Sequence, residues 1–101
     1  MVDGKGVMVE IVAKKKGCVL CDLAIAILEE ITPEFEKGLL RWEVVDVGSR
    51  EGLIRFDELT QICGSRPAVP SLIINEGIAF DHIPDYDALS KAVLQGMKGQ
   101  D

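Results

Sequence analysis

The order of the apolar segments constrains the fold of this chain more than any other feature. Two segments rich in β-branched residues, 7–13 and 39–47, predict buried strands, and apolar residues at helical spacing separate them. Strands joined through a helix normally pair in parallel by a right-handed crossover. A second helical segment, a short hairpin and a third helical segment follow, which gives the order β-α-β-α-β-β-α. With 101 residues, we expect a single α/β domain spanning residues 1–101.

The boundaries of the first two helices follow from their flanking residues. We expect the first helix to begin at or just before Cys21 and to stop or kink at Pro33, with Thr32 capping a short extra turn. The second helix is predicted over residues 51–63 with Gly64 as its C-cap. The apolar stripe expected on the second helix consists of Leu53, Ile54, Phe56, Leu59, Ile62 and Cys63.

The C-terminal third of the chain predicts a hairpin and a last helix. Segments 71–74 and 78–80 have the composition of short strands around a turn in which Gly77 is expected to take a positive φ. Apolar residues at helical spacing over residues 85–95, after a proline and with acidic residues in the first turn, predict the third helix.

Two cysteines, Cys18 and Cys21, stand between the first strand and the first helix. Positions i and i+3 share one face of a helix, so these thiols can close into a small disulfide. Unpaired N–H groups and the macrodipole at a helix N-terminus favour the thiolate over the thiol. The motif is therefore a candidate redox site.

The overall charge and the cysteine count limit which partners and which cellular compartment we expect for this protein. A formal charge of −6 argues against nucleic acid as a main partner, because phosphate binding needs a positive surface. The N-terminal apolar stretch is too short and too interrupted by acid for a signal sequence or a membrane span. The odd number of cysteines, three, fits a reducing compartment better than a disulfide-stapled secreted domain. We expect a cytoplasmic monomer that binds neither membrane nor nucleic acid.

A second motif, Val69-Pro70, precedes the third predicted strand. Together with a Cys-x-x-Cys that opens the first helix, it makes residues 7–97 resemble the thioredoxin superfamily, and most closely its small glutaredoxin-like members. The resemblance implies a thioredoxin-like fold, a four-stranded mixed sheet flanked by helices. It also implies that Cys18 is the nucleophile and Cys21 the resolving thiol of a thiol–disulfide oxidoreductase. Pro70 would be cis, and the backbone of Val69 would bind an extended substrate or glutathione.

The lysine run 14–16 directly precedes the motif. A nearby cation stabilises a thiolate and attracts the carboxylates of glutathione, and Lys16 is the best single candidate for this role. A solvated strand end explains the same run equally well.

Some features of the resembling families are missing. Thioredoxins carry a buried acid in the strand before the motif, and the matching position here is Val12, with Glu10 in that place only if the register shifts. Residues 80–84 replace the glycine pair that lets glutaredoxins approach a glutathione carboxylate. Asp85 and Asp87 are candidate ligands for an ammonium group, although helix capping explains them as well. The electron donor stays open between glutathione and a flavoprotein reductase of the thioredoxin type, with protein or low-molecular-weight disulfides as substrates.

Other functions remain as alternatives. The same fold can serve as a redox sensor or binding module without turnover, or as an iron–sulfur carrier that uses glutathione as a ligand. Cys18, Cys21, Cys63 and His82 have the composition of a zinc site, but their spacing is poor for one. We expect no resident metal or cofactor. Cys63 is interpreted as a core residue, the alternative being a third redox thiol near the Val69-Pro70 loop.

Overall fold

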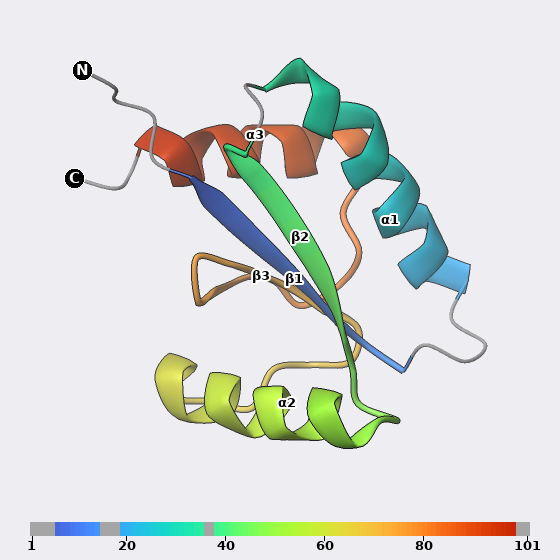
Figure 1. The fold of residues 1–101 in the computed structure, drawn as a ribbon, viewed down its shortest axis with the longest axis vertical. Coiled ribbons are helices and arrows are strands. Elements are labelled where there is room, and N and C mark those ends of the chain that lie inside the picture. The colour runs from blue at the N-terminus through green and yellow to red at the C-terminus, as the bar shows by residue number, and fades with distance from the viewer. Residues whose placement is uncertain (1–5, 15–18, 36–37, 99–101) are drawn as a thin grey trace.

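The sheet at the centre of the protein has four strands, in the order β2-β1-β3-β4. The computed structural model describes residues 6–14, 19–35 and 38–98 (Figure 1). Strand β1 pairs in parallel with β2 and antiparallel with β3, and β3 forms a hairpin with β4. The strands are β1 (Val7–Ala13), β2 (Leu40–Asp46), β3 (Ser71–Ile74) and β4 (Gly77–Phe80). The predicted order of elements and the mixed α/β architecture are thus confirmed.

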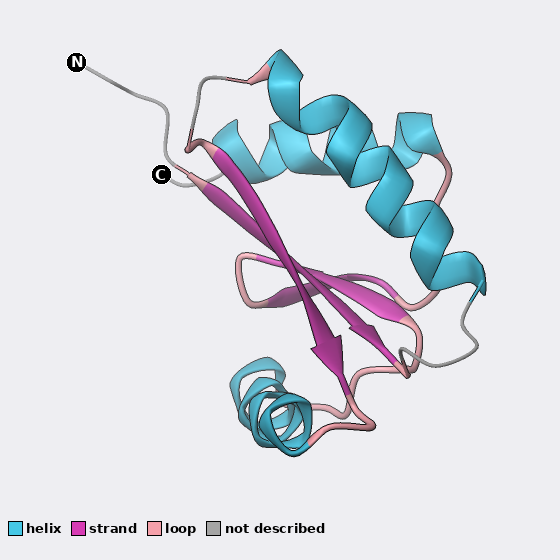
Figure 2. Ribbon diagram, turned by 45° about the vertical axis from the view of Figure 1, so that its right-hand side comes forward, coloured by secondary structure: helices cyan, strands magenta, loops and turns pink. Residues whose placement is uncertain are grey.

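Helices cover both faces of this sheet (Figure 2). Helices α1 (Val19–Ile31) and α3 (Tyr86–Lys98) lie on one face, and α2 (Arg50–Cys63) lies on the other. A 3-10 turn, η1 (Thr32–Glu34), follows α1 directly. Because each helix needs an apolar surface to bury its own apolar stripe, this arrangement produces two cores, one on each side of the sheet.

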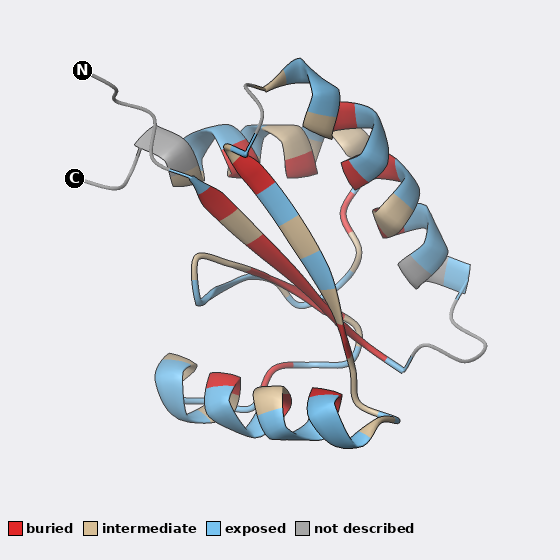
Figure 3. Cartoon of the chain, viewed as in Figure 1, coloured by how far each residue is buried: buried red, intermediate tan, exposed pale blue. Residues whose placement is uncertain are grey.

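Strand β1 contributes to both cores, and it is the most deeply buried strand in the protein (Figure 3). Side chains alternate across a strand, so Val9 and Ile11 enter the core beneath α1 and α3, whereas Val12 enters the core beneath α2. The sequence boundaries predicted for this strand are those of the structure.

The end of α1 differs from the prediction. The α-helix ends at Ile31, and a short 3-10 turn begins at Thr32 with Pro33 in its first positions, where the restricted backbone of proline is tolerated. Thr32 does not cap this turn. Its hydroxyl donates instead to the Leu28 carbonyl at 2.6 Å, because a threonine one turn further along a helix can bond the carbonyl four residues before it.

The hairpin turn differs as well. Asn75 and Glu76 have positive φ values, 51° and 67°, whereas Gly77 does not, so that prediction was wrong. Ile74 pairs with Gly77, which leaves a two-residue loop, and loops of this length favour left-handed conformations at both positions. The side-chain oxygen of Asn75 accepts from the backbone N–H of Met8 at 3.0 Å, and the backbone N–H of Asn75 donates to the Met8 carbonyl at 2.9 Å. These contacts hold the turn against β1.

Only part of the predicted stripe on α2 is buried. Phe56 and Leu59 are buried, whereas Leu53, Ile54 and Ile62 are each about half exposed, which corrects the prediction for these three residues. Helical geometry puts Phe56 and Leu59 on the same face as Gly52. Gly52 packs so closely against the backbone of β2 that a Cβ added to it would lie 1.8 Å from the Asp46 carbonyl oxygen. This approach fixes which face of α2 meets the sheet.

The ends of α2 and α3 lie close to their predicted positions. Ser49 caps α2, accepting from the Gly52 amide at 3.0 Å, and Gly64 ends the helix at φ 77°, as expected of a left-handed C-cap. Helix α3 runs from Tyr86 to Lys98, a few residues beyond the expected end.

One side-chain contact ties the start of α3 to the turn after α1. The Tyr86 hydroxyl donates to Glu34 Oε2 at 2.9 Å. The carboxylate raises the pKa of Tyr86, mainly through this hydrogen bond, because ionisation would set two negative charges side by side.

We expect Tyr86 to ionise above the ordinary tyrosine value of about 10. Tyr86 is the only tyrosine in the chain, so phenolate absorbance in an alkaline titration reports this group alone. Replacing Glu34 with Gln should lower the midpoint toward the ordinary value, while Glu29→Gln in α1 serves as the control and should leave it unchanged. The same midpoint in wild type and Glu34→Gln would contradict the contact.

Candidate functional site

In the sequence, the cysteine motif stands between the end of β1 and the first turn of α1. Helix α1 begins at Val19, so Cys21 belongs to its first turn, in agreement with the predicted start. Cys18 and Lys16, as well as the side chain of Cys21, lie outside the described residues. The structure therefore places the backbone of the second cysteine at the N-terminus of a helix, where unpaired amides favour negative charge.

The Val69-Pro70 motif reaches the same end of the sheet. Its peptide bond is cis, as expected, and it stands directly before β3. Because β3 runs antiparallel to β1, Ser71 at the start of β3 pairs with Val12 near the end of β1. The C-terminal end of β1 and the start of β3 therefore lie at the same end of the sheet (Figure 2).

Exposed apolar side chains mark both of these segments. Val19 is 79% exposed, Leu23, one turn further along α1, is 50% exposed, and Val69 is 47% exposed. Pro70 itself is partly buried. Isolated exposed apolar residues are common, but here they occur on both of the segments that carry the predicted site.

Ser71 is a residue of this region that the sequence interpretation did not single out. It is fully buried, and its hydroxyl has no hydrogen-bond partner within the part of the chain that the structure describes. A buried hydroxyl without a partner is costly, so such groups usually serve a further purpose or bind water. A serine directly after a Val-Pro motif carries no sequence signal that would predict its burial.

The strand before the motif does contain a buried acid, and it is Glu10. Its side chain is on the face of β1 that α2 covers, together with Val12, and the residue is only 3% exposed. Arg55 of α2 binds both of its carboxylate oxygens, at 2.6 Å through Nε and at 3.0 Å through a terminal nitrogen. The bond to Glu10 raises the pKa of the Arg55 guanidinium above its already high ordinary value. Val12, the position that the resemblance matches to the thioredoxin acid, lies in the apolar core beneath α2.

Arg55 also joins α2 to the hairpin turn. Its Nη1 binds the exposed carboxylate of Glu58 at 3.0 Å, and Nη2, which also binds Glu10, binds the exposed carboxylate of Glu76 at 3.2 Å. The Cys63 thiol donates to the carbonyl of Glu76 at 3.3 Å. Since the turn lies at the opposite end of β3 from Pro70, Cys63 is not near the Val69-Pro70 loop, and it is partly rather than fully buried. Neither interpretation of Cys63 fits completely.

The remaining candidate polar residues have local partners. Asp85 accepts from the Ala88 amide at 2.9 Å and thereby caps α3, which favours the capping interpretation over ammonium binding. Asp81 contacts the exposed His82 at 2.9 Å, and this hydrogen bond lowers the pKa of Asp81. Residues 6–14, 19–35 and 38–98 contain no group of three or more His, Cys, Asp or Glu side chains arranged to hold a metal ion. Within the same ranges no helix has the length and apolar character needed to cross a membrane.

The ion pair between Glu10 and Arg55 gives a testable energetic consequence. Arg55→Met leaves a buried carboxylate without its counter-charge, so we expect a loss of about 3 kcal/mol in the free energy of unfolding, measured by urea denaturation. Arg50→Met, at the exposed first position of the same helix, is the control and should cost less than about 0.5 kcal/mol. The double variant Glu10→Leu with Arg55→Leu should recover most of the loss. An Arg55→Met protein as stable as Arg50→Met would contradict this account.

Comparisons with known proteins bear on the fold alone. No protein-family model matches this chain. No curated protein matches it either. A solved structure described as that of a malarial protein superposes with a TM-score of 0.61 over 92% of this chain and 98% of that chain, at 18% sequence identity. The chain is therefore similar in fold to a protein of nearly the same extent, with an α/β architecture built on a four-stranded mixed sheet.

Proposed function

We propose that this protein is a small thiol–disulfide oxidoreductase of thioredoxin-like fold that uses Cys18 and Cys21. One observation carries the proposal: β1 ends at the same end of the sheet at which the Val69-Pro70 loop enters, and α1, which begins directly after Cys18 in the sequence, has Cys21 in its first turn. The order β-α-β-α-β-β-α and the strand order β2-β1-β3-β4 support the same family. A loop and a helix N-terminus held by a buried strand form a rigid base for a reactive group.

The proposed reaction is a two-step exchange. The Cys18 thiolate attacks one sulfur of a substrate disulfide, forming a mixed disulfide and releasing the other sulfur as a thiolate that takes up a proton. Cys21 then loses its proton and attacks the sulfur of Cys18, which releases the substrate as a dithiol. The substrate gains two electrons and two protons, and the protein keeps a Cys18–Cys21 disulfide. Two molecules of glutathione, or the dithiol of a flavoprotein reductase, return the protein to its reduced form.

The surface around the motif favours a polypeptide as the substrate. Val19, Leu23 and Val69 offer exposed apolar contacts to an extended chain. Glutathione carries two carboxylates, which would need positive partners instead. Lys14 is exposed at the end of β1 and, with Lys16, is a candidate for that role. A cytoplasmic location would supply both candidate reductants.

Trapping and turnover together test the proposal. Cys21→Ser should accumulate a stable mixed disulfide on Cys18 with a model disulfide-containing protein, because the second step is blocked. Wild-type protein should turn over with glutathione and glutathione reductase, or with NADPH and thioredoxin reductase, measured as NADPH consumption. Mass spectrometry of the trapped protein locates the bond.

Cys63→Ser is the matched control, since it removes the remaining cysteine and should leave trapping and turnover intact. Trapping on Cys63, or no mixed disulfide at all, would contradict the proposal. Trapping on Cys18 without turnover in either reducing system would favour a redox sensor instead. The observation that favours the sensor is that Glu10 is engaged by Arg55, so it is not free to take the proton of the resolving thiol.

A further inference from the structure

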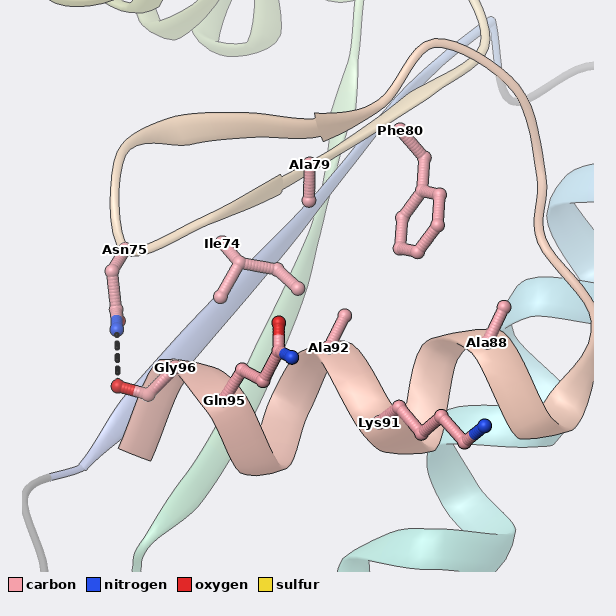
Figure 4. A pocket seen from close by; sticks show the side chains of 9 residues that line it. All are labelled: Ile74, Asn75, Ala79, Phe80, Ala88, Lys91, Ala92, Gln95 and Gly96. Carbon is pink, nitrogen blue, oxygen red and sulfur yellow. Dashed lines mark hydrogen bonds between the residues drawn. The ribbon is translucent and has the colours of Figure 1, made fainter. Parts of the chain in front are cut away.

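An open hollow of about 560 Å³ lies between α3 and the β3–β4 hairpin, and the proposed redox reaction does not use it (Figure 4). Neither Val69 nor Pro70 lines it. Its size is within the range of small-molecule sites, which commonly measure about 300–1,000 Å³. Its walls come from two elements that are far apart in the sequence.

A register shift in the hairpin builds the upper wall. Leu72 pairs with Phe80 and Ile73 with Ile78, so Ala79 is an extra residue without a partner on β3. Such a bulge turns two successive side chains to the same face of a strand. Figure 4 shows the side chains of Ala79 and Phe80 both pointing toward α3.

Small residues on α3 leave the opposite wall open. Ala88 and Ala92 lie one turn apart on the helix face that looks toward the hairpin (Figure 4). Larger side chains at these positions would fill the space in front of Phe80. The methyl groups of the α3 alanines and the side chains of Ala79 and Phe80 therefore form an apolar part of the lining.

Polar groups stand at one side of this apolar surface. The amide of Gln95 rises from α3 toward the hairpin, and Lys91 lies along the same helix (Figure 4). Lys91 is exposed, and none of the ion pairs found among the described residues involves it. A free cation and an amide donor next to an apolar hollow complement a ligand that has an apolar body and one negative charge.

We propose that this hollow binds a small apolar carboxylate, with its tail between Phe80 and the α3 alanines and its charge at Lys91. The flexible stem of lysine lets the ammonium group reach a carboxylate held at the rim. The chain as a whole has a formal charge of −6, so a site for an anion depends on this local cation.

Octanoate and its uncharged counterpart octanamide are the probes that test the proposal. In protein labelled with ¹³C at the alanine methyl groups, octanoate should cause saturable shifts at Ala79, Ala88 and Ala92. The methyl group of Ala26, exposed on α1, is the internal reference and should not move. Octanamide should bind more weakly, because it lacks the charge.

Two variants separate the charge from the apolar contact. Lys91→Gln should weaken octanoate binding about two- to five-fold, the strength of one exposed ion pair, and leave octanamide binding unchanged. Arg41→Gln removes an exposed positive charge on β2, at the opposite edge of the sheet from β4, and is the control. Ala92→Leu should fill the hollow and weaken both probes; if that variant unfolds, Ala79→Leu makes the same test from the hairpin side.

Three results would overturn the proposal. The first is the absence of saturable shifts at the three alanines. The second is equal binding of octanoate and octanamide together with no effect of Lys91→Gln. The third is a shift of Ala26 as large as those of the hollow, which would indicate general association with apolar surfaces.

Discussion

The burial of β1 on both faces is the constraint on which the other elements depend. Residues 7–13 pair with β2 on one side and residues 9–12 pair with β3 on the other, so the middle of the strand is hydrogen-bonded on both sides within the sheet. Its side chains enter two separate cores, and both must be closed by helices. Three helices on two faces follow from that requirement, and the end of β1 sets where the first of them begins.

Glu10 makes this central strand depend on α2. A carboxylate in the middle of a buried strand is tolerated only with a counter-charge, and Arg55 supplies it with two hydrogen bonds. The same arginine reaches Glu76, so one side chain fixes β1, α2 and the hairpin turn relative to each other. This cluster holds the end of the molecule opposite the proposed redox site, and the hydrogen bonds of Asn75 to Met8 reinforce it.

Local sequence signals predicted the elements well, because apolar periodicity and flanking glycine or proline act over short distances. The bounds of β1 and the C-cap at Gly64 are examples. The predictions that failed depend on tertiary contacts. Glycine adopts a positive φ without steric cost, which predicts Gly77 for that position, but Gly77 pairs with Ile74 and the turn consists of Asn75 and Glu76.

The burial of individual side chains was the other part that the sequence left undetermined. The close approach of Gly52 to Asp46 of β2 selected the face of α2 that meets the sheet, and Leu53 and Ile62 are left about half exposed. For the candidate site, the placement of Cys21 at a helix start and the cis bond before Pro70 were predictable from motifs. The orphaned hydroxyl of Ser71 and the pairing of Glu10 were not, because both result from strand register and helix packing.

The central proposal is that Cys18, the residue directly before α1 in the sequence, is an activated nucleophile. The most direct measurement is the rate of Cys18 alkylation by iodoacetamide as a function of pH, followed by mass spectrometry, with Cys63 in the same protein as the internal comparison. The account predicts that Cys18 reacts through a thiolate already formed near neutral pH, with its midpoint below the ordinary cysteine value of about 8.5. A midpoint at or above that value, with a rate near neutral pH no greater than that of an ordinary exposed thiol, would contradict it.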